Sequence, residues 1–245
     1  MVAILNKEIR SFFSTPTGYL VVGIFLTLCS LFLFVFSGSY NILDNGFADL
    51  KPFFDLAPWI FIFLIPAITM KSFAEETRQG TMELLLTKPV SIWNLVLGKY
   101  FGALLVSFIA LLPSLFYVFT IYALGDPLGN IDIGATLGSY LGLVLVAASY
   151  TSIGIFSSAV SSNQITAFII SVFLCFVLFF AFDGITDFKL FGDSDYGIEY
   201  LGMSYHYKSM SRGVLDTRDL IYFLSLILLF LSFTYFKMHS TKIKA

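Results

Sequence analysis

Long apolar stretches without a charged side chain dominate the chain. Residues 11–43, 56–70, 100–125, 133–182 and 220–236 contain no Asp, Glu, Lys or Arg. Apolar stretches of about 17–25 residues are long enough for a helix to cross the ~30 Å hydrocarbon core of a bilayer. The stretches are continuous rather than alternating between apolar and polar residues, which excludes a transmembrane β-barrel. The pattern therefore predicts an all-α polytopic membrane protein.

The longest stretch, 133–182, must contain two spans. As one helix it would reach about 75 Å, which is far more than a bilayer. The polar cluster Ser161-Ser162-Asn163 is the natural turn between its two halves. Six transmembrane helices follow for the whole chain, which we expect to be one membrane domain over 1–245. They are predicted at 18–38, 53–71, 98–124, 135–160, 165–182 and 219–237.

The segment before the first span predicts an amphipathic helix that lies in the membrane interface. Over residues 1–15, apolar side chains recur at helical spacing, with Lys7 and Arg10 on the other face. The sequence Thr15-Pro16-Thr17-Gly18 should break this helix before the first span. It serves either as a topology anchor or as a lever between the first span and a cytoplasmic partner.

The 71–97 loop after the second span is the most informative polar segment. Its charges are followed by the leucine run 84–86 and then by Pro89, so a short helix should end before the proline. These leucines either dock into a partner, as apolar anchors do, or pack against the chain's own helices. Ser91 should cap the next helix, in which Gly98, Gly102 and Ala103 allow a close neighbour.

Small residues and prolines give further expectations about the spans. Gly134, Gly138 and Gly142 form a small-residue face that suits either helix packing within the chain or an interface between protomers. Pro66 and Pro113 should bend their helices.

The segment 183–218 before the last span is acidic and aromatic. We expect a helix over residues 200–212 that Gly213 ends, and an N-cap at Asp216 with Asp219 for the last span. Its tyrosines suit a belt at the membrane interface. They are Tyr196, Tyr200, Tyr205 and Tyr207.

Composition and charge agree with this picture and orient it. The chain is 58% hydrophobic and 12% charged, whereas soluble domains contain about 25% charged residues. The N-terminus, the 71–97 loop, the turn after the fourth span and the C-terminus lie on one side of the membrane. With Lys99 and Lys237 at the adjoining span ends, this side holds nine cations and four acids, and the other side holds five cations and twelve acids. The positive-inside rule therefore places both termini in the cytoplasm.

The residues that usually carry chemistry are missing from the expected places. His206 and His239 lack partners at metal-ligand spacing, Cys29 and Cys175 fall within spans, and Gly98-Lys99 is no phosphate-binding loop. No span interior carries an ionisable side chain, which argues against ion-coupled transport. We expect no catalytic residue, metal, cofactor or nucleic-acid partner, and an energy source on another chain.

The 71–97 loop resembles that of the permeases of type-2 ABC exporters. AEETRQGTMELLLTKPVS followed by LGKYFGA is similar to the family's cytoplasmic loop between spans two and three, which forms the coupling helix on the ATPase subunit. FFSTPTGYLV and YHYKSMSRGVLDTRDLIYF further resemble permeases of gliding-motility ABC transporters of Bacteroidetes-type bacteria. The resemblance implies a bacterial inner-membrane exporter, an ABC ATPase subunit, and a second permease copy, paralogous permease or accessory subunit.

The resemblance also implies roles for individual residues of the loop. It assigns Glu75, Glu76 and Arg78 to the charged ATPase interface, and the following positions to the coupling helix. Those positions are Gly80, Thr81, Glu83, Leu84, Leu85 and Leu86. Two other classes remain open: a membrane anchor or scaffold of a motility or secretion machine, whose phenotype would not need coupled ATPase, and a secondary carrier, which would need an ion gradient.

Overall fold

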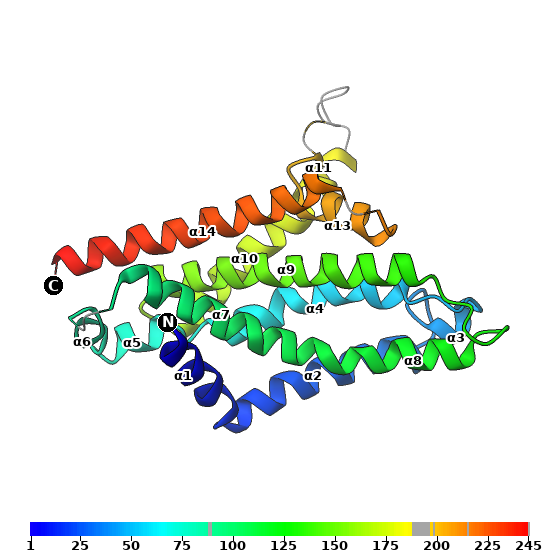
Figure 1. Cartoon of the computed structure of the whole chain (residues 1–245), viewed down its shortest axis with the longest axis horizontal. Helices are drawn as coiled ribbons and strands as arrows, with labels where there is room; N and C mark the ends of the chain where they lie inside the picture. The colour runs from blue at the N-terminus through cyan, green and yellow to red at the C-terminus, as the bar shows by residue number, and fades with distance from the viewer. Residues whose placement is uncertain (88–89, 188–196, 198, 215, 245) are drawn as a thin grey trace.

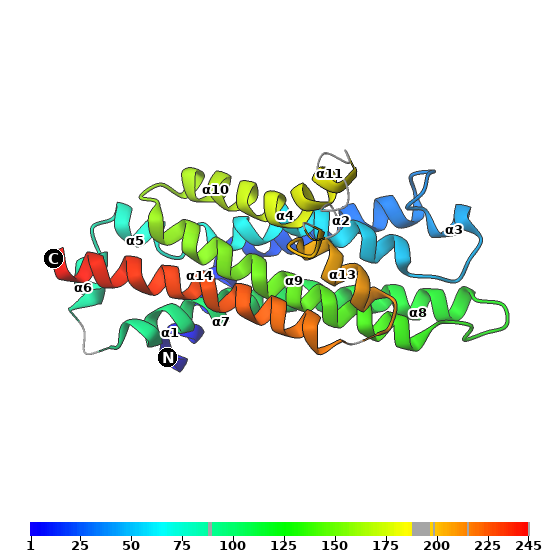
Figure 2. The ribbon, with the colours of Figure 1, turned by 90° about the horizontal axis from the view of Figure 1, so that it is seen from above.

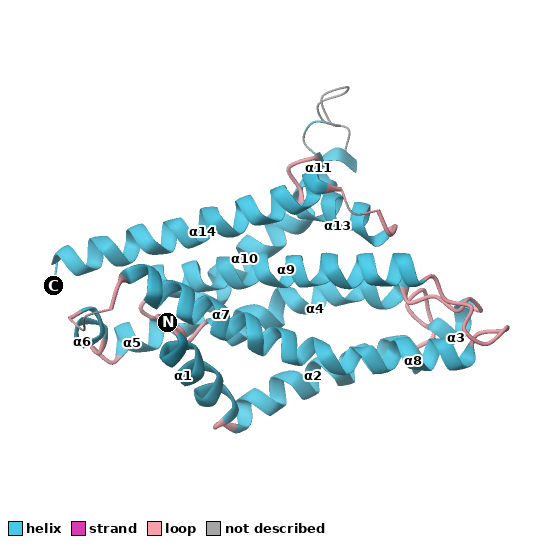
Figure 3. Ribbon diagram, in the orientation of Figure 1, coloured by secondary structure: helices cyan, strands magenta, loops and turns pink. Residues whose placement is uncertain are grey.

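All elements in the described part of the chain are helices (Figures 1 and 3). The computed structural model describes residues 1–87, 90–187, 197, 199–214 and 216–244. The expected all-α fold is thereby confirmed. The longer elements are α1 (Val2–Phe13), α2 (Pro16–Phe34), α4 (Lys51–Thr69), α7 (Ile92–Leu111), α8 (Leu115–Leu124), α9 (Ile133–Val160), α10 (Gln164–Phe176) and α14 (Thr217–Lys244). The short ones are α3 (Ile42–Asn45), α5 (Ala74–Arg78), α6 (Met82–Leu86), α11 (Phe182–Asp187) and α13 (Met203–Ser211).

Five helical stretches of the described residues are long and apolar enough to cross a membrane. They are Lys51–Arg78, Ile92–Leu124, Ile133–Val160, Gln164–Thr186 and Thr217–Ile243. A sixth span is counted only when α1 and α2 are taken together, and these helices meet at 69°. The first span, predicted at 18–38, is shorter in the structure because α2 ends at Phe34.

The predicted breaks between helices are present where local chemistry requires them. Helix α1 ends at Phe13, and Pro16 begins α2, where its missing N–H and fixed φ are tolerated. Helix α9 ends at Val160, and the Asn163 side chain accepts a hydrogen bond of 2.9 Å from the Ile165 N–H at the start of α10. The two halves of the stretch 133–182 are thus separate helices.

The prolines within spans act differently from one another. Helix α4 continues through Pro66 to Thr69. At Pro113 the α-helix is interrupted by the 3₁₀ turn η1 (Leu112–Ser114) and resumes as α8. Another irregular turn, the π-helix η2 (Val177–Ala181), joins α10 to α11.

Helix α9 is the centre of the bundle. It contacts α4, α7, α10, α13 and α14 (Figure 2). Small side chains along it let the neighbouring backbones approach closely, as is common between membrane helices. At Gly154, a Cβ atom would overlap Thr69 of α4.

Both ends of the chain lie toward the end of the molecule that holds α5 and α6 (Figure 1). We call this the α6 end, and the opposite end, which holds α3 and the loop between α8 and α9, the α3 end. Helix α13 packs against α9 between the two ends. The 71–97 loop therefore lies at the same end of the bundle as α1.

Candidate functional site

The 71–97 loop folds into two short helices joined at Gly80. Gly80 has φ +69°, a conformation that favours glycine, and the Thr81 N–H donates to the Glu76 carbonyl at 3.0 Å. This is the hydrogen bond of a glycine-terminated helix end. The chain therefore turns sharply between α5 and α6 because residue 80 has no side chain. Helix α6 ends at Leu86, before Lys88 and Pro89, which lie outside the described residues.

Helix α5 is fastened to the central helix α9 by one buried hydroxyl. The Ser158 Oγ accepts hydrogen bonds from the Phe73 and Ala74 N–H groups, at 2.9 and 3.0 Å. The same oxygen donates to the Met70 carbonyl at 3.0 Å. Since the first N–H groups of a helix have no partner within it, Ser158 satisfies groups that burial would otherwise leave unpaired.

The exposed side chains of the two short helices form a polar surface. Arg78, Gln79 and Glu83 are exposed, and Arg78 pairs with Glu75 at 3.2 Å. Leu85 is half-buried and packs against the chain's own core. The side chains of Leu84 and Leu86 lie outside what the structure describes. Leu85 thus has neighbours within the chain, which is the second of the two roles open to the leucines.

A buried lysine joins three elements beneath this surface. The Lys99 side chain, on α7, is 2% exposed, and its Nζ lies 3.0 Å from Glu8 Oε1 and 2.9 Å from Glu76 Oε1. It also donates to the Ser72 carbonyl and lies 4.9 Å from the centre of the Phe73 ring. An ammonium group has three N–H donors, so this geometry satisfies all of them. We call Lys99, Glu8 and Glu76 the buried ion network.

Close packing between α1 and α7 brings Glu8 to this lysine. A Cβ on Gly98 would lie 3.0 Å from Ile4, and a Cβ on Gly102 would lie 2.8 Å from the Glu8 Cβ. The expected close neighbour of these glycines is therefore the N-terminal helix of the same chain. Glycine at both positions lets the α1 backbone lie directly on α7.

The buried ion network also has unused acceptors. Glu76 Oε1 accepts from exposed Lys7 at 3.2 Å, but the second oxygens of Glu75 and Glu76 are buried without a partner among the described residues. A polar hollow of about 540 Å³ adjoins these carboxylates. It is lined by residues that include Ser11, Lys71, Gln79, Thr81 and Leu85. Such an arrangement can receive a polar or cationic side chain.

Sequence reasoning missed Lys99 and Glu8. Lys99 stands within the apolar helix Ile92–Leu111, so the span that was expected to lack an interior charge contains a buried one near its α6 end. A single lysine in an apolar helix is a usable signal because a buried charge needs a partner. Its partners lie 91 and 23 residues away in the sequence, and only the packing brings them together.

The glycine row on α9 faces another part of the same chain. A Cβ on Gly138 would overlap the Met210 carbonyl, and a Cβ on Gly142 would lie 3.1 Å from the Tyr207 ring. Both glycines thus pack against α13. Gly134 is exposed, and a Cβ there would meet only Asp132, at 3.4 Å.

The segment before the last span is only partly as expected. Helix α13 begins at Met203 rather than at Tyr200, and Gly213 follows its end with φ +80°. Tyr207 is 4% exposed and donates to the Phe54 carbonyl at 2.8 Å, so its expected place in an interface belt is wrong. Burial raises the pKa of this phenol well above its ordinary value, which keeps the donor proton in place. Tyr196 lies outside the described residues.

The expected N-cap of the last span is formed by one of its two acids. Asp216 accepts from the Arg218 N–H at 2.9 Å. Asp219 instead lies 2.7 Å from Nδ1 of His206, whose Nε2 lies 3.0 Å from the Tyr200 carbonyl. Both ring nitrogens thus have an oxygen neighbour within hydrogen-bond distance. Among the described residues, no group of three His, Cys, Asp or Glu side chains could hold a metal ion.

One family model matches almost the whole chain. The model is described as ABC-2 family transporter protein, and it covers residues 2–236. The match includes α1, both short helices of the 71–97 loop, and α14 as far as Phe236. No curated protein matches the chain.

Proposed function

The chain belongs to the ABC-2 family of transporter proteins, and we propose that this multi-pass permease is the membrane subunit of an ATP-driven exporter. Membership implies pairing with an ABC ATPase subunit, which would bind and hydrolyse ATP on a separate chain. The direction of transport is inferred from the resemblance of the 71–97 loop to that of type-2 exporters. A second permease copy or a paralogous subunit would complete the path.

The observation that carries the coupling role is the attachment of α5 on its membrane side. Ser158 joins the start of α5 to α9, and the buried ion network joins Glu76 of α5 to α7 and α1. A force applied to α5 and α6 therefore reaches three long helices through short contacts. Small shifts at such a packed junction are passed on because a dense core does not deform continuously.

The polar surface of α5 and α6 is the proposed contact with the ATPase. Arg78 and Glu83 are exposed there, and their charges suit pairing with charges on a partner. The adjacent polar hollow, which Glu75, Gln79 and Thr81 line, would receive a polar side chain from the ATPase. The other assigned positions, Gly80 and Thr81, would set the angle between the two helices.

The localisation that we propose follows from the charge balance of the loops. The α6 end would face the cytoplasm of a bacterial cell, since its segments carry nine cations against four acids. Both termini, which lie toward that end, would then be cytoplasmic (Figure 1). The membrane is proposed to be the inner membrane.

A second permease would contact the exposed end of the glycine row on α9. Gly134 is the glycine of that row that does not pack against α13.

The biological process that we propose is gliding motility or surface secretion. This inference rests on the resemblance of FFSTPTGYLV and YHYKSMSRGVLDTRDLIYF to permeases of gliding-motility ABC transporters. The two motifs cover the bend between α1 and α2, and α13 with the start of α14.

Co-purification with the ATPase tests the proposal. Arg78→Glu and Glu83→Lys should each reduce the amount of co-purified ATPase, because interface anchors commonly contribute about 2 kcal/mol or more. The ATPase activity that depends on the permease should fall with it. Arg218→Glu makes the same change at an exposed position at the start of α14 and should leave both readouts unchanged.

The same experiment separates the alternative functions. Full complex formation and coupled ATPase activity in both variants would overturn the coupling role of α5 and α6. A normal motility or secretion phenotype without coupled ATPase would favour an anchor or scaffold. Transport that follows an ion gradient rather than ATP would favour a secondary carrier.

A further inference from the structure

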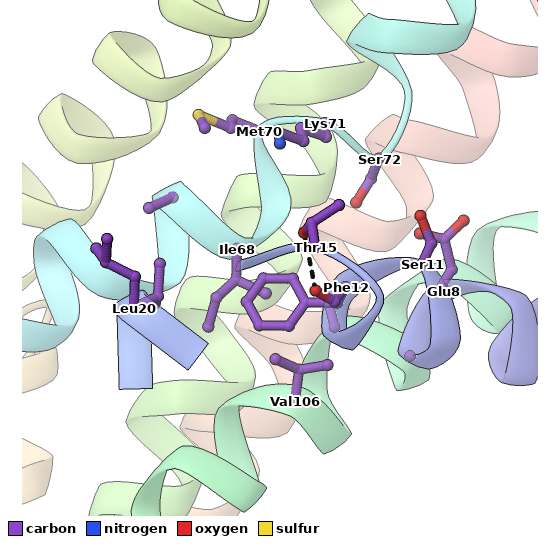
Figure 4. A pocket seen from close by; sticks show the side chains of 14 residues that line it. Glu8, Ser11, Phe12, Thr15, Leu20, Ile68, Met70, Lys71, Ser72 and Val106 are labelled. Carbon is purple, nitrogen blue, oxygen red and sulfur yellow. Dashed lines mark hydrogen bonds between the residues drawn. The ribbon is translucent and has the colours of Figure 1, made fainter. Parts of the chain in front are cut away.

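A pocket of about 250 Å³ lies at the bend between α1 and α2 (Figure 4). Its walls come from α1, α2, α4 and α7, and much of them is apolar. Figure 4 shows Phe12 between Ile68 and Val106, with Leu20 on α2 to one side. Leu20 is 58% exposed, so this wall of the pocket continues onto the outer, apolar surface of the bundle. The pocket is therefore reached from the side of the molecule that faces lipid.

Polar groups gather at another side of the same pocket. Glu8 and Ser11 of α1 and Lys71 and Ser72 after α4 line it there (Figure 4). The Glu8 carboxylate is already paired with Lys99 at 3.0 Å, so its charge is compensated. The Lys71 ammonium is exposed and forms no ion pair with any side chain in the described ranges. The pocket thus combines apolar walls with one uncompensated positive charge.

The position of α1 places this combination at the depth of lipid headgroups. The helix is amphipathic and meets α2 at 69°, as expected of a helix that lies along the membrane surface while α2 enters the bilayer. At that depth a lysine keeps its ammonium group among phosphates and its stem against apolar surface. An anionic lipid presents the complementary arrangement of a charged phosphate and an apolar chain.

We propose that this pocket binds an anionic phospholipid of the leaflet at the α6 end. The lipid phosphate would pair with Lys71, and one acyl chain would lie against Leu20, Val21 and Ala67 of the pocket wall. Burial of the chain supplies affinity that a single exposed cation cannot supply, so a soluble phosphate would not replace the lipid. A bound lipid would touch α1, α2, α4 and α7 together. This site does not depend on the ATPase or on the direction of transport.

Native mass spectrometry of the full chain in detergent tests the site. The purified protein is stripped of lipid and titrated with phosphatidylglycerol or phosphatidylcholine of the same chain length. A lysine near a membrane surface contributes about 1 kcal/mol to anionic lipid binding, which corresponds to an approximately fivefold preference for phosphatidylglycerol. Lys71→Gln should abolish this preference and leave phosphatidylcholine binding unchanged. Lys237→Gln removes an exposed cation of α14 that lines a hollow together with Thr77 and Glu83 at the same end, and it should keep the preference.

Filling the pocket tests the acyl-chain half. Ala67→Phe on α4 and Val21→Phe on α2 place a ring in the same space from different walls. Each variant should reduce the binding of both lipids severalfold while the protein still elutes as a single species. The same reduction in both variants would indicate that the filled pocket, rather than misfolding, causes the loss of binding. Sn-glycerol 1-phosphate should not compete.

Three results would overturn the proposal. They are an unchanged lipid preference in Lys71→Gln, native lipid binding in both filled variants, and competition by sn-glycerol 1-phosphate at the concentration at which the lipid binds. The last result would indicate a simple anion site rather than a lipid site.

Discussion

Lys99 stands in an apolar helix, yet its side chain is only 2% exposed and has three acceptors within reach. Two of these acceptors are carboxylates from different elements, α1 and α5. A buried ammonium group is tolerated because the carboxylates and the carbonyl replace its water shell. At the scale of single residues, this lysine determines where α1 and α5 meet α7.

Lys99→Met should destabilise the protein strongly. Removal of one partner of a buried ion pair leaves the other charge uncompensated, which typically costs about 3–5 kcal/mol. Glu8 and Glu76 would be the groups left behind. The free energy of unfolding in mixed detergent micelles measures the effect.

Lys7→Met is the matched control for this prediction. Lys7 contacts the same carboxylate of Glu76, but its side chain is 61% exposed. An exposed pair contributes about 1 kcal/mol or less, so this variant should remain close to the native stability. Equal losses of unfolding free energy in the two variants would show that the burial of Lys99 does not determine its contribution to stability.

At the scale of elements, α1 packs closely against α7 because two positions of α7 are glycines without side chains. Gly98 and Gly102 leave no room for a Cβ on α7 against Ile4 and Glu8. The amphipathic helix is therefore held in place by packing on α7, in addition to its affinity for the membrane surface. Such packing is what a lever between a span and a cytoplasmic partner requires.

Gly102→Val should lift α1 from α7. The new Cβ would lie 2.8 Å from the Glu8 Cβ, so the helices must separate, and overpacking of this kind typically costs about 1–3 kcal/mol. The lifted helix would also withdraw Glu8 from Lys99. We expect a lower free energy of unfolding and a loss of ATPase activity that depends on the permease.

Gly23→Val controls for the general cost of valine in a helix. Gly23 lies in α2, and a Cβ atom at this position would have no neighbour within 4 Å among the described residues. The variant should unfold at the same detergent composition as the native chain. A Gly102→Val protein as stable as Gly23→Val would mean that α1 is not seated on α7 in the membrane.

At the scale of the whole molecule, the two ends of the helical bundle hold different elements. The α6 end holds α1, the buried ion network and the 71–97 loop, whereas the α3 end holds the loop between α8 and α9 (Figures 1 and 2). Helix α13 packs on α9 between them through Gly138 and Gly142. This asymmetry gives the proposed orientation a direct test.

Thr77→Cys should be labelled only from the cytoplasm, and Leu128→Cys only from outside the inner membrane. Both positions are exposed, and they lie in the 71–97 loop and in the loop between α8 and α9. A membrane-impermeant maleimide on spheroplasts measures the two variants. The native cysteines, Cys29 and Cys175, are buried and should give little background. Labelling of position 77 in intact spheroplasts would show that the 71–97 loop lies outside, which contradicts the proposed orientation.

The sequence by itself determined the features that depend on local chemistry. Continuous apolar stretches require helices in a bilayer because each backbone N–H and C=O group needs a partner within its own segment. Pro16 and Asn163 set the starts of α2 and α10 through their own backbone and side-chain preferences. The turn at Gly80 was not among these predictions, since the resemblance places Gly80 within the coupling helix. In the structure its φ of +69° separates α5 from α6.

Only the tertiary structure decided which surfaces meet. Tyr207 has an amphipathic side chain that would suit an interface, but the space over Gly142 and the Phe54 carbonyl holds it inside the protein. Glu8 and Lys99 form an ion pair although they are 91 residues apart in the sequence. The physical reason is that burial, charge pairing and close approach depend on distances between helices, and the spacing of residues within one helix does not fix those distances.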